Sequence, residues 1–216
     1  GRDRFARLLY GTRVSLVLAP AAALLSTLIA GLIGGAAGYL GGRWERAVTS
    51  GIDLFLSLPW LFLLLAVRAL LPLNTSPVAS VAITFFLLGC LGWAAPARVI
   101  RAGTRTLANS DYLVQARAAG VAPWRVFWRH LLPNLRPILL AQFWISVPLF
   151  ILSEANLGLL GLGVSEPLPS WGALLRDLEN YSAVLQNPWM LAPAVLLVVV
   201  VSCLQLLLRT EETAAC

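Results

Sequence analysis

Residues 14–42 read VSLVLAPAAALLSTLIAGLIGGAAGYLGG, a stretch of 29 residues without a charged side chain. Residues 69–97 and 180–208 are equally long and also carry no charge. An α-helix needs about 20 apolar residues to cross a hydrocarbon core about 30 Å thick, so each stretch is long enough for one crossing and its ends. The pattern predicts three membrane-spanning helices.

Two further apolar stretches carry one acid each, Asp53 within 47–67 and Glu154 within 137–165, and both remain long enough to cross. We therefore predict an all-α polytopic membrane protein with five transmembrane helices, near residues 14–39, 52–71, 78–100, 135–160 and 189–208. Of the 216 residues 59% are hydrophobic and 12% charged, and the mean hydropathy is +0.81. Soluble domains carry about 25% charge, so this composition excludes a water-soluble enzyme.

The basic residues exclude several kinds of chemistry. All 16 of them are arginine, and the formal net charge is +6. A chain without lysine has neither a P-loop nor a lysine Schiff base, so any ATP must be hydrolysed by another protein. The arginines flank apolar runs, where they determine topology rather than bind nucleic acid. A single histidine, His130, and three scattered cysteines provide no set of metal ligands, and we expect no metal site.

The charges also predict an orientation. With residues 101–134 in the cytoplasm, ten arginines lie inside and six outside, as the positive-inside rule favours. In residues 1–13, Phe5, Leu8 and Leu9 alternate with arginines, which predicts an amphipathic segment along the lipid headgroups. Residues 14–208 then form the membrane domain and 209–216 a cytoplasmic tail.

Small residues and prolines shape the predicted helices. Gly31, Gly34 and Gly38 form a strip on one face of the first crossing, where it allows close helix contact. We favour ordinary packing of this strip over a partner-specific dimer face. Pro59 and Pro148 predict kinks or breaks in their spans.

Residues 104–134, TRTLANSDYLVQARAAGVAPWRVFWRHLLPN, are far more charged than their surroundings and predict two short helices. Asn109 or Ser110 can cap the first helix, and Gly120 ends it. Pro123 can begin the second helix, and Pro133 stops it.

The second of these helices carries apolar side chains at i, i+3, i+4 and i+7, namely Trp124, Phe127, Trp128 and Leu131. Such a strip on a cytoplasmic loop requires a place to be buried. From the pattern alone two interpretations stay open. One is the membrane interface, where tryptophan is enriched, and the other is a groove on a soluble partner, into which amphipathic helices dock.

Several parts of the chain together resemble one known family. The loop patterns are Asp111-Tyr112-x-x-x-Ala116-Arg117-Ala118-x-Gly120 and Trp124-Arg125-x-Phe127-x-Arg129-His130-x-Leu132-Pro133-Asn134. They resemble the cytoplasmic EAA loop of ABC importer permeases, and the dipeptide, oligopeptide and nickel branch is the most similar. Residues 1–16, 154–163 and 169–172 agree with that branch in the expected order.

The resemblance implies a permease subunit without catalysis of its own, in a bacterial or archaeal cytoplasmic membrane. It implies a second permease subunit, two ATPase subunits that bind ATP and Mg²⁺, and an extracytoplasmic solute-binding protein, with no cofactor on this chain. The solute would be a di- or oligopeptide. A nickel chelate or other small solute, a degenerate scaffold subunit and a passive channel are the alternatives.

The resemblance also assigns the loop to ATPase coupling and favours the partner groove for the tryptophan strip. The coupling residues it implies are Asp111, Tyr112, Ala116, Gly120, Trp124, Arg125, Phe127, Trp128, Arg129, Leu132 and Pro133. The chain departs from the family at Val114, where glutamate is usual, and at Gln115 and Glu45. The family normally has six spans, so we expect a further span upstream in the natural protein, or its loss.

Two acids lie inside predicted spans, where an ionised group usually faces a cavity or a partner. We expect Asp53 near the membrane interface, paired with Arg46 or with another subunit. Glu154 lies deeper and either lines the translocation path or anchors a neighbouring helix, and we favour the anchor.

A last candidate segment comprises Pro169, Ser170, Trp171 and Gly172. The segment follows proline-rich sequence on the predicted extracytoplasmic side. We expect it either to contact the binding protein or to place Trp171 at the headgroups.

Overall fold

The computed structural model describes residues 4–70, 76–163 and 168–214, and all regular secondary structure in these ranges is helical. Four helical stretches there are long and apolar enough to cross a membrane, and five if the broken pair α2 and α3 counts as one span. The predicted all-helical membrane fold is therefore confirmed.

The α-helices are α1 (Arg4–Leu40), α2 (Gly42–Ser57), α3 (Trp60–Leu70), α4 (Pro77–Leu91), α5 (Ala94–Ala108), α6 (Asp111–Ala118), α7 (Pro123–Val126), α8 (Leu132–Leu159), α9 (Trp171–Arg176), α10 (Tyr181–Gln186) and α11 (Ala192–Ala214). A π-helix, η1 (Phe127–Leu131), joins α7 to α8, and two 3₁₀-helices, η2 (Asp177–Glu179) and η3 (Pro188–Leu191), flank α10.

The chain forms two compact units. Unit 1 comprises Gly1–Ala23, Trp60–Gly89 and Trp144–Cys216, and unit 2 comprises Leu24–Pro59 and Cys90–Phe143. The helices α1 and α8 each contribute one part to each unit.

The helix α1 allows its neighbours to approach closely. Every buried residue between positions 11 and 38 is glycine, alanine, serine or threonine. In unit 2, a Cβ added to Gly34 would lie 2.4 Å from the carbonyl oxygen of Ala97, and one added to Gly38 would lie 2.5 Å from that of Arg101. The strip at these two glycines therefore packs directly against the α5 backbone, as the sequence predicts.

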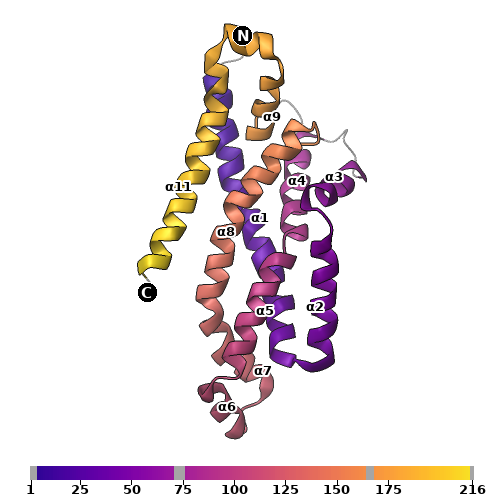
Figure 1. Cartoon of the computed structure of the whole chain (residues 1–216), viewed down its shortest axis with the longest axis vertical. Coiled ribbons are helices and arrows are strands. Elements are labelled where there is room, and N and C mark those ends of the chain that lie inside the picture. The colour runs from indigo at the N-terminus through magenta and orange to yellow at the C-terminus, as the bar shows by residue number, and fades with distance from the viewer. Residues whose placement is uncertain (1–3, 71–75, 164–167, 215–216) are drawn as a thin grey trace. The chain divides into compact units, whose positions relative to one another are not determined.

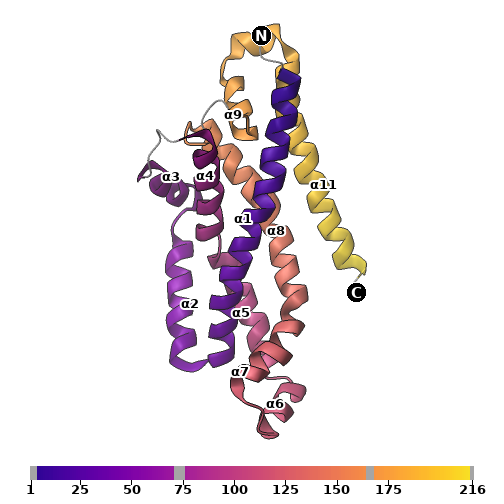
Figure 2. The ribbon, with the colours of Figure 1, turned by 180° about the vertical axis from the view of Figure 1, so that it is seen from behind.

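Unit 2 is organised around α5. The helix α2 runs alongside it (Figure 1), and Ile52 of α2 joins Ala94, Ala97 and Ile100 of α5 in a buried cluster with Ala30 of α1. Figures 1 and 2 both show α6 at the end of this unit, beyond the turn that joins α1 to α2.

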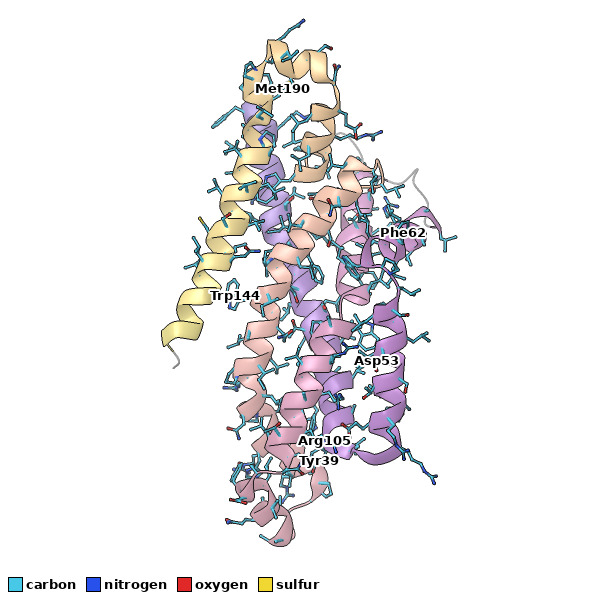
Figure 3. All side chains as sticks on the ribbon, in the orientation of Figure 1. Tyr39, Asp53, Phe62, Arg105, Trp144 and Met190 are labelled. Carbon is cyan, nitrogen blue, oxygen red and sulfur yellow. The ribbon has the colours of Figure 1, made fainter. Side chains whose placement is uncertain are left out.

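Unit 1 joins the first part of α1 to the C-terminal helices. The starts of α1 and α11 line a pocket of about 280 Å³ together with Met190, which Figure 3 labels. The helix α3 contacts the second half of α8, where the indole N–H of Trp60 donates to the Ser153 hydroxyl (3.0 Å). Arg68 of α3 is buried and donates to the Leu162 carbonyl and the Ser80 hydroxyl, each at 3.1 Å.

The helix boundaries agree with the sequence at Pro59 and differ from it at Pro133. The helix α1 runs unbroken from Arg4 to Leu40, so residues 4–13 and the first predicted span form one helix. The predicted span 52–71 is broken at Pro59, as the sequence predicts, because the proline ring holds Leu58 in an extended conformation (φ −79°, ψ 131°). Pro133 does not stop the coupling helix. The Leu132 N–H bonds to the Phe127 carbonyl across a π-turn, and this wider turn leads directly into α8.

Candidate functional site

The loop between α5 and α8 is a compact two-helix elbow. As predicted, α6 begins at Asp111 and ends just before Gly120, which adopts φ +76°. The Val121 N–H bonds to the Ala116 carbonyl (3.2 Å), the long-range bond of a Schellman C-cap. Pro123 occupies the first turn of α7, where its missing N–H removes no helical hydrogen bond.

A buried cluster fixes the elbow to its own unit. It consists of Leu113 from α6, Val126 from α7, Leu131 from η1 and Leu135 from α8. Tyr39 of α1 packs against this cluster. Its hydroxyl donates to the Pro123 carbonyl (2.8 Å), and its ring lies edge-on to that of Phe127, with centroids 5.5 Å apart. Figure 3 labels Tyr39 at this junction. The elbow is therefore held by α1 and α8 together.

A second brace lies within the elbow itself. The Tyr112 hydroxyl of α6 and the His130 Nδ1 of η1 are hydrogen-bonded at 2.5 Å. Asn134 donates to the His130 carbonyl (2.7 Å) and holds the same turn. Sequence reasoning missed this brace, because the two partners are 18 positions apart and no periodic pattern connects them.

The outer face of the elbow is aromatic and exposed. Trp124 is 63% exposed and Trp128 is 55% exposed, one helical turn apart. The Arg125 guanidinium lies 5.4 Å from the centre of the Trp124 ring, a cation–π contact. The other exposed coupling candidates are Asp111, Tyr112, Gly120, Arg129 and Pro133, together with Val114 at the departure from the family pattern.

The predicted apolar strip is divided between two surfaces. Trp124 and Trp128 point outward, whereas Leu131 is fully buried and Phe127 is half-buried against Tyr39. A stripe with this spacing is at least about 100° wide, so its two edges can face different surroundings. Leu131 and the buried side of the Phe127 ring therefore hold the elbow in place, and neither belongs to its outer face. Ala116 and Leu132 are likewise half-buried.

A buried carboxyl organises unit 1. Glu154 of α8 is fully buried, and the Ser15 hydroxyl of α1 donates to its Oε2 (3.2 Å). The Ser170 hydroxyl and the Gly172 backbone also face this carboxyl. A Cβ added to Gly172 would lie 2.8 Å from Glu154 Oε1, so glycine is required for this close approach. The geometry favours the helix anchor over the path-lining interpretation.

The segment predicted to contact a binding protein is instead internal. Pro169, Ser170, Trp171 and Gly172 are all buried, and the Trp171 indole N–H donates to Thr12 Oγ1 (3.0 Å). Ser170 caps α9 by accepting from the Ala173 N–H (3.2 Å). These side chains join α9 to α1 and to Glu154, which corrects both the binding-protein contact and the placement of Trp171 at the headgroups.

The two acids of α2, Asp53 and Glu45, form ion pairs with arginines of α5. Asp53 forms an ion pair with Arg98, not with Arg46 as predicted. Glu45 is nearly buried, and its two oxygens accept from Arg101 (2.6 Å) and Arg105 (2.5 Å). Figure 3 labels Asp53 and Arg105 on these facing helices.

The chain is similar to known transport proteins. A sequence profile of the family described as "binding-protein-dependent transport system inner membrane component" matches residues 18–210. The chain is 33% identical over 191 residues to the dipeptide transport system permease protein DppC of Bacillus subtilis, a match that covers 88% of this chain and 57% of that protein. It is 31% identical over 204 residues to the oligopeptide transport system permease protein OppC of Haemophilus influenzae, covering 94% and 63%. The chain thus spans about three fifths of the length of these relatives.

A solved structure has the same fold. It is described as an inward-facing conformation of the MetNI methionine ABC transporter, and the similarity has a TM-score of 0.72 over 100% of this chain and 99% of that chain. The two sequences are 19% identical, so the similarity concerns the fold alone.

Proposed function

Because this chain belongs to the family of binding-protein-dependent transport system inner membrane components, we propose that it is the permease subunit of an ATP-driven importer in a bacterial or archaeal cytoplasmic membrane. The observation that carries this proposal is the exposed pair Trp124 and Trp128, which stands on a braced elbow. Two large aromatic side chains held in water by a rigid support are typical of a surface that a partner covers.

The partner that this surface fits is an ATPase subunit. The chain has no lysine and therefore no P-loop, so nucleotide and Mg²⁺ bind to that subunit and not to this one. An amphipathic helix docks by laying its apolar face into a groove, and the indoles provide that face. Arg125 stacks on Trp124 and can pair with an acid at the rim of the groove.

Coupling follows from the way the elbow is held. When the ATPase subunits close on ATP, the docked elbow moves with them. Tyr39 and the buried cluster around Val126 transmit this displacement to α1 and α8. Docking drives the exchange of inward and outward openings only if the groove contacts the elbow differently in the two states. A rigid elbow transmits such a difference, whereas a loose loop would absorb it.

The proposed solute is a di- or oligopeptide. Both DppC and OppC are named for peptides, and the match to each extends over most of this chain. The complete importer would contain a second permease subunit, two ATPase subunits and an extracytoplasmic binding protein that delivers the solute.

The test is uptake by the complete complex in proteoliposomes. We expect entry of a labelled dipeptide or oligopeptide to require both ATP and the binding protein. The double variant Trp124→Ala/Trp128→Ala is expected to lose at least about 100-fold in uptake, because it removes both aromatic anchors of the docking surface. Trp144→Ala, on an exposed part of α8, is the control and should retain uptake. ATP-independent flux would show a channel instead.

A further inference from the structure

The turn that joins α1 to α2 carries an exposed basic and aromatic surface. Arg43, Trp44 and Arg46 are all exposed, Trp44 by 55%. Gly41 and Gly42 adopt positive φ values of 66° and 62°, which turn the chain sharply at this point. We call these three exposed side chains the turn patch.

The one acid within the turn does not neutralise the patch. Glu45 points inward, where Arg101 and Arg105 occupy both of its carboxylate oxygens. Neither Arg43 nor Arg46 forms an ion pair with any residue that the structure describes. The patch therefore presents two guanidinium groups whose charge no acid of this unit balances.

The ion pairs of Glu45 place the patch at the end of the apolar helices. Arg105 precedes the last residue of α5, Ala108, by three positions, and α6 follows further along the chain. At about 1.5 Å per residue, the turn lies roughly one helical turn before the end of α5. Figures 1 and 2 show α6 extending beyond it. In a membrane, the elbow would project from the surface while the patch lies at headgroup level.

We propose that the turn patch binds the headgroups of acidic phospholipids. Guanidinium groups bind phosphate oxygens in a bidentate manner, and an indole prefers the boundary between headgroups and acyl chains. Arg43, Trp44 and Arg46 are all exposed at the start of α2, so this end of the helix provides both kinds of contact. Each arginine contributes about 1 kcal/mol near an anionic surface, which corresponds to about fivefold in affinity.

The experiment is native mass spectrometry of the full-length protein with added phosphatidylglycerol or phosphatidylcholine. We expect tighter binding of phosphatidylglycerol, and we expect Arg43→Gln/Arg46→Gln to weaken it by about 25-fold, the product of two fivefold steps. Phosphatidylcholine binding should change less than about twofold. The control Arg13→Gln/Arg136→Gln removes the same charge from two other exposed positions. It should retain most of the preference for phosphatidylglycerol over phosphatidylcholine.

Two results would overturn the assignment. One is undiminished phosphatidylglycerol binding in the Arg43→Gln/Arg46→Gln variant. The other is an equal loss in the control, which would show a general charge effect and no site. Unchanged lipid binding with weaker retention of an ATPase subunit would assign the patch to that protein. Thermal unfolding of each variant checks the fold, and peptide uptake tests the proposed transport function separately.

Discussion

The two units each contain a buried glutamate, and the two carboxyls are held in opposite ways. In unit 1, Glu154 accepts from the Ser15 hydroxyl and faces Ser170 and the Gly172 backbone, and it has no ion pair among the described residues. In unit 2, Glu45 is bound by the guanidinium groups of Arg101 and Arg105.

The difference follows from position along the helices. Glu154 lies within an apolar stretch, where polar partners must be short side chains and backbone groups of closely packed helices. Glu45 lies one turn into α2, where the side chain of Arg105 still reaches solvent, with 60% exposure. Glu154 is therefore a packing anchor, and Glu45 is an electrostatic clamp between α2 and α5. The two should respond differently to the same substitutions.

The largest effect is expected for Glu154→Ala. It removes the shared acceptor of buried hydroxyl groups and leaves a cavity, which should cost about 3–4 kcal/mol of unfolding free energy. Glu154→Gln retains the size and one acceptor oxygen and should cost less than about half as much. Denaturant titration in detergent measures both. Equal losses would show that the negative charge itself is required, and the anchor account would then fail.

Gly172→Ala should destabilise unit 1 by about 2–3 kcal/mol, the cost of overpacking. The added methyl group would lie within 2.8 Å of the Glu154 carboxyl oxygen and of the Gly158 Cα, so α9 must move away from α8. Gly51→Ala is the matched control, because nothing lies within 4 Å of the added atom. We expect the control to be neutral or slightly stabilising in the same titration. A neutral Gly172→Ala would contradict the close approach.

Glu45→Gln should cost about 1–2 kcal/mol, because it leaves Arg101 and Arg105 without a counter-charge. The partial exposure of both arginines limits the effect. Unlike Glu154→Gln, it is expected to weaken with added salt, since ions screen the exposed part of the clamp. The free energy of unfolding, measured at low and at high salt, distinguishes Glu45→Gln from Glu154→Gln. A salt-independent loss would indicate a packing role for Glu45 as well.

The smallest effect is expected for Asp53→Asn, which removes the ion pair with Arg98. Both side chains are about half exposed, at 55% and 50%, and such pairs contribute less than about 1 kcal/mol. Thermal unfolding should shift by no more than a few degrees. A shift as large as that of Glu45→Gln would mean that exposure does not decide the strength of these pairs.

The parts of the fold that the sequence predicted depend on local signals. Uncharged stretches mark the spans because water and lipid select side chains residue by residue. Gly120 and Pro123 mark the limits of the elbow helices because each acts on its own backbone. Gly34 and Gly38 indicate close packing because only small residues permit it.

The predictions that were wrong concern side chains whose surroundings are set by contacts between distant parts of the sequence. The inward face of Phe127 is set by Tyr39, which lies in another helix, and no spacing within 104–134 reveals it. Asp53 forms its ion pair with Arg98 and not with Arg46, which is nearer in sequence, because the packing of α2 against α5 determines which arginine is within reach. Trp171 resembles an interfacial tryptophan in sequence but is buried, because Thr12 provides its hydrogen-bond acceptor.

The most direct test of the transport account is a site-specific photocrosslink from position 128 in the complete, membrane-embedded complex. Trp128 is exposed and belongs to the outer face of the elbow. The account predicts a crosslink to an ATPase subunit at this position and none from Val198, an exposed residue of the apolar helix α11. Crosslinks from position 128 that reach only lipid would contradict it.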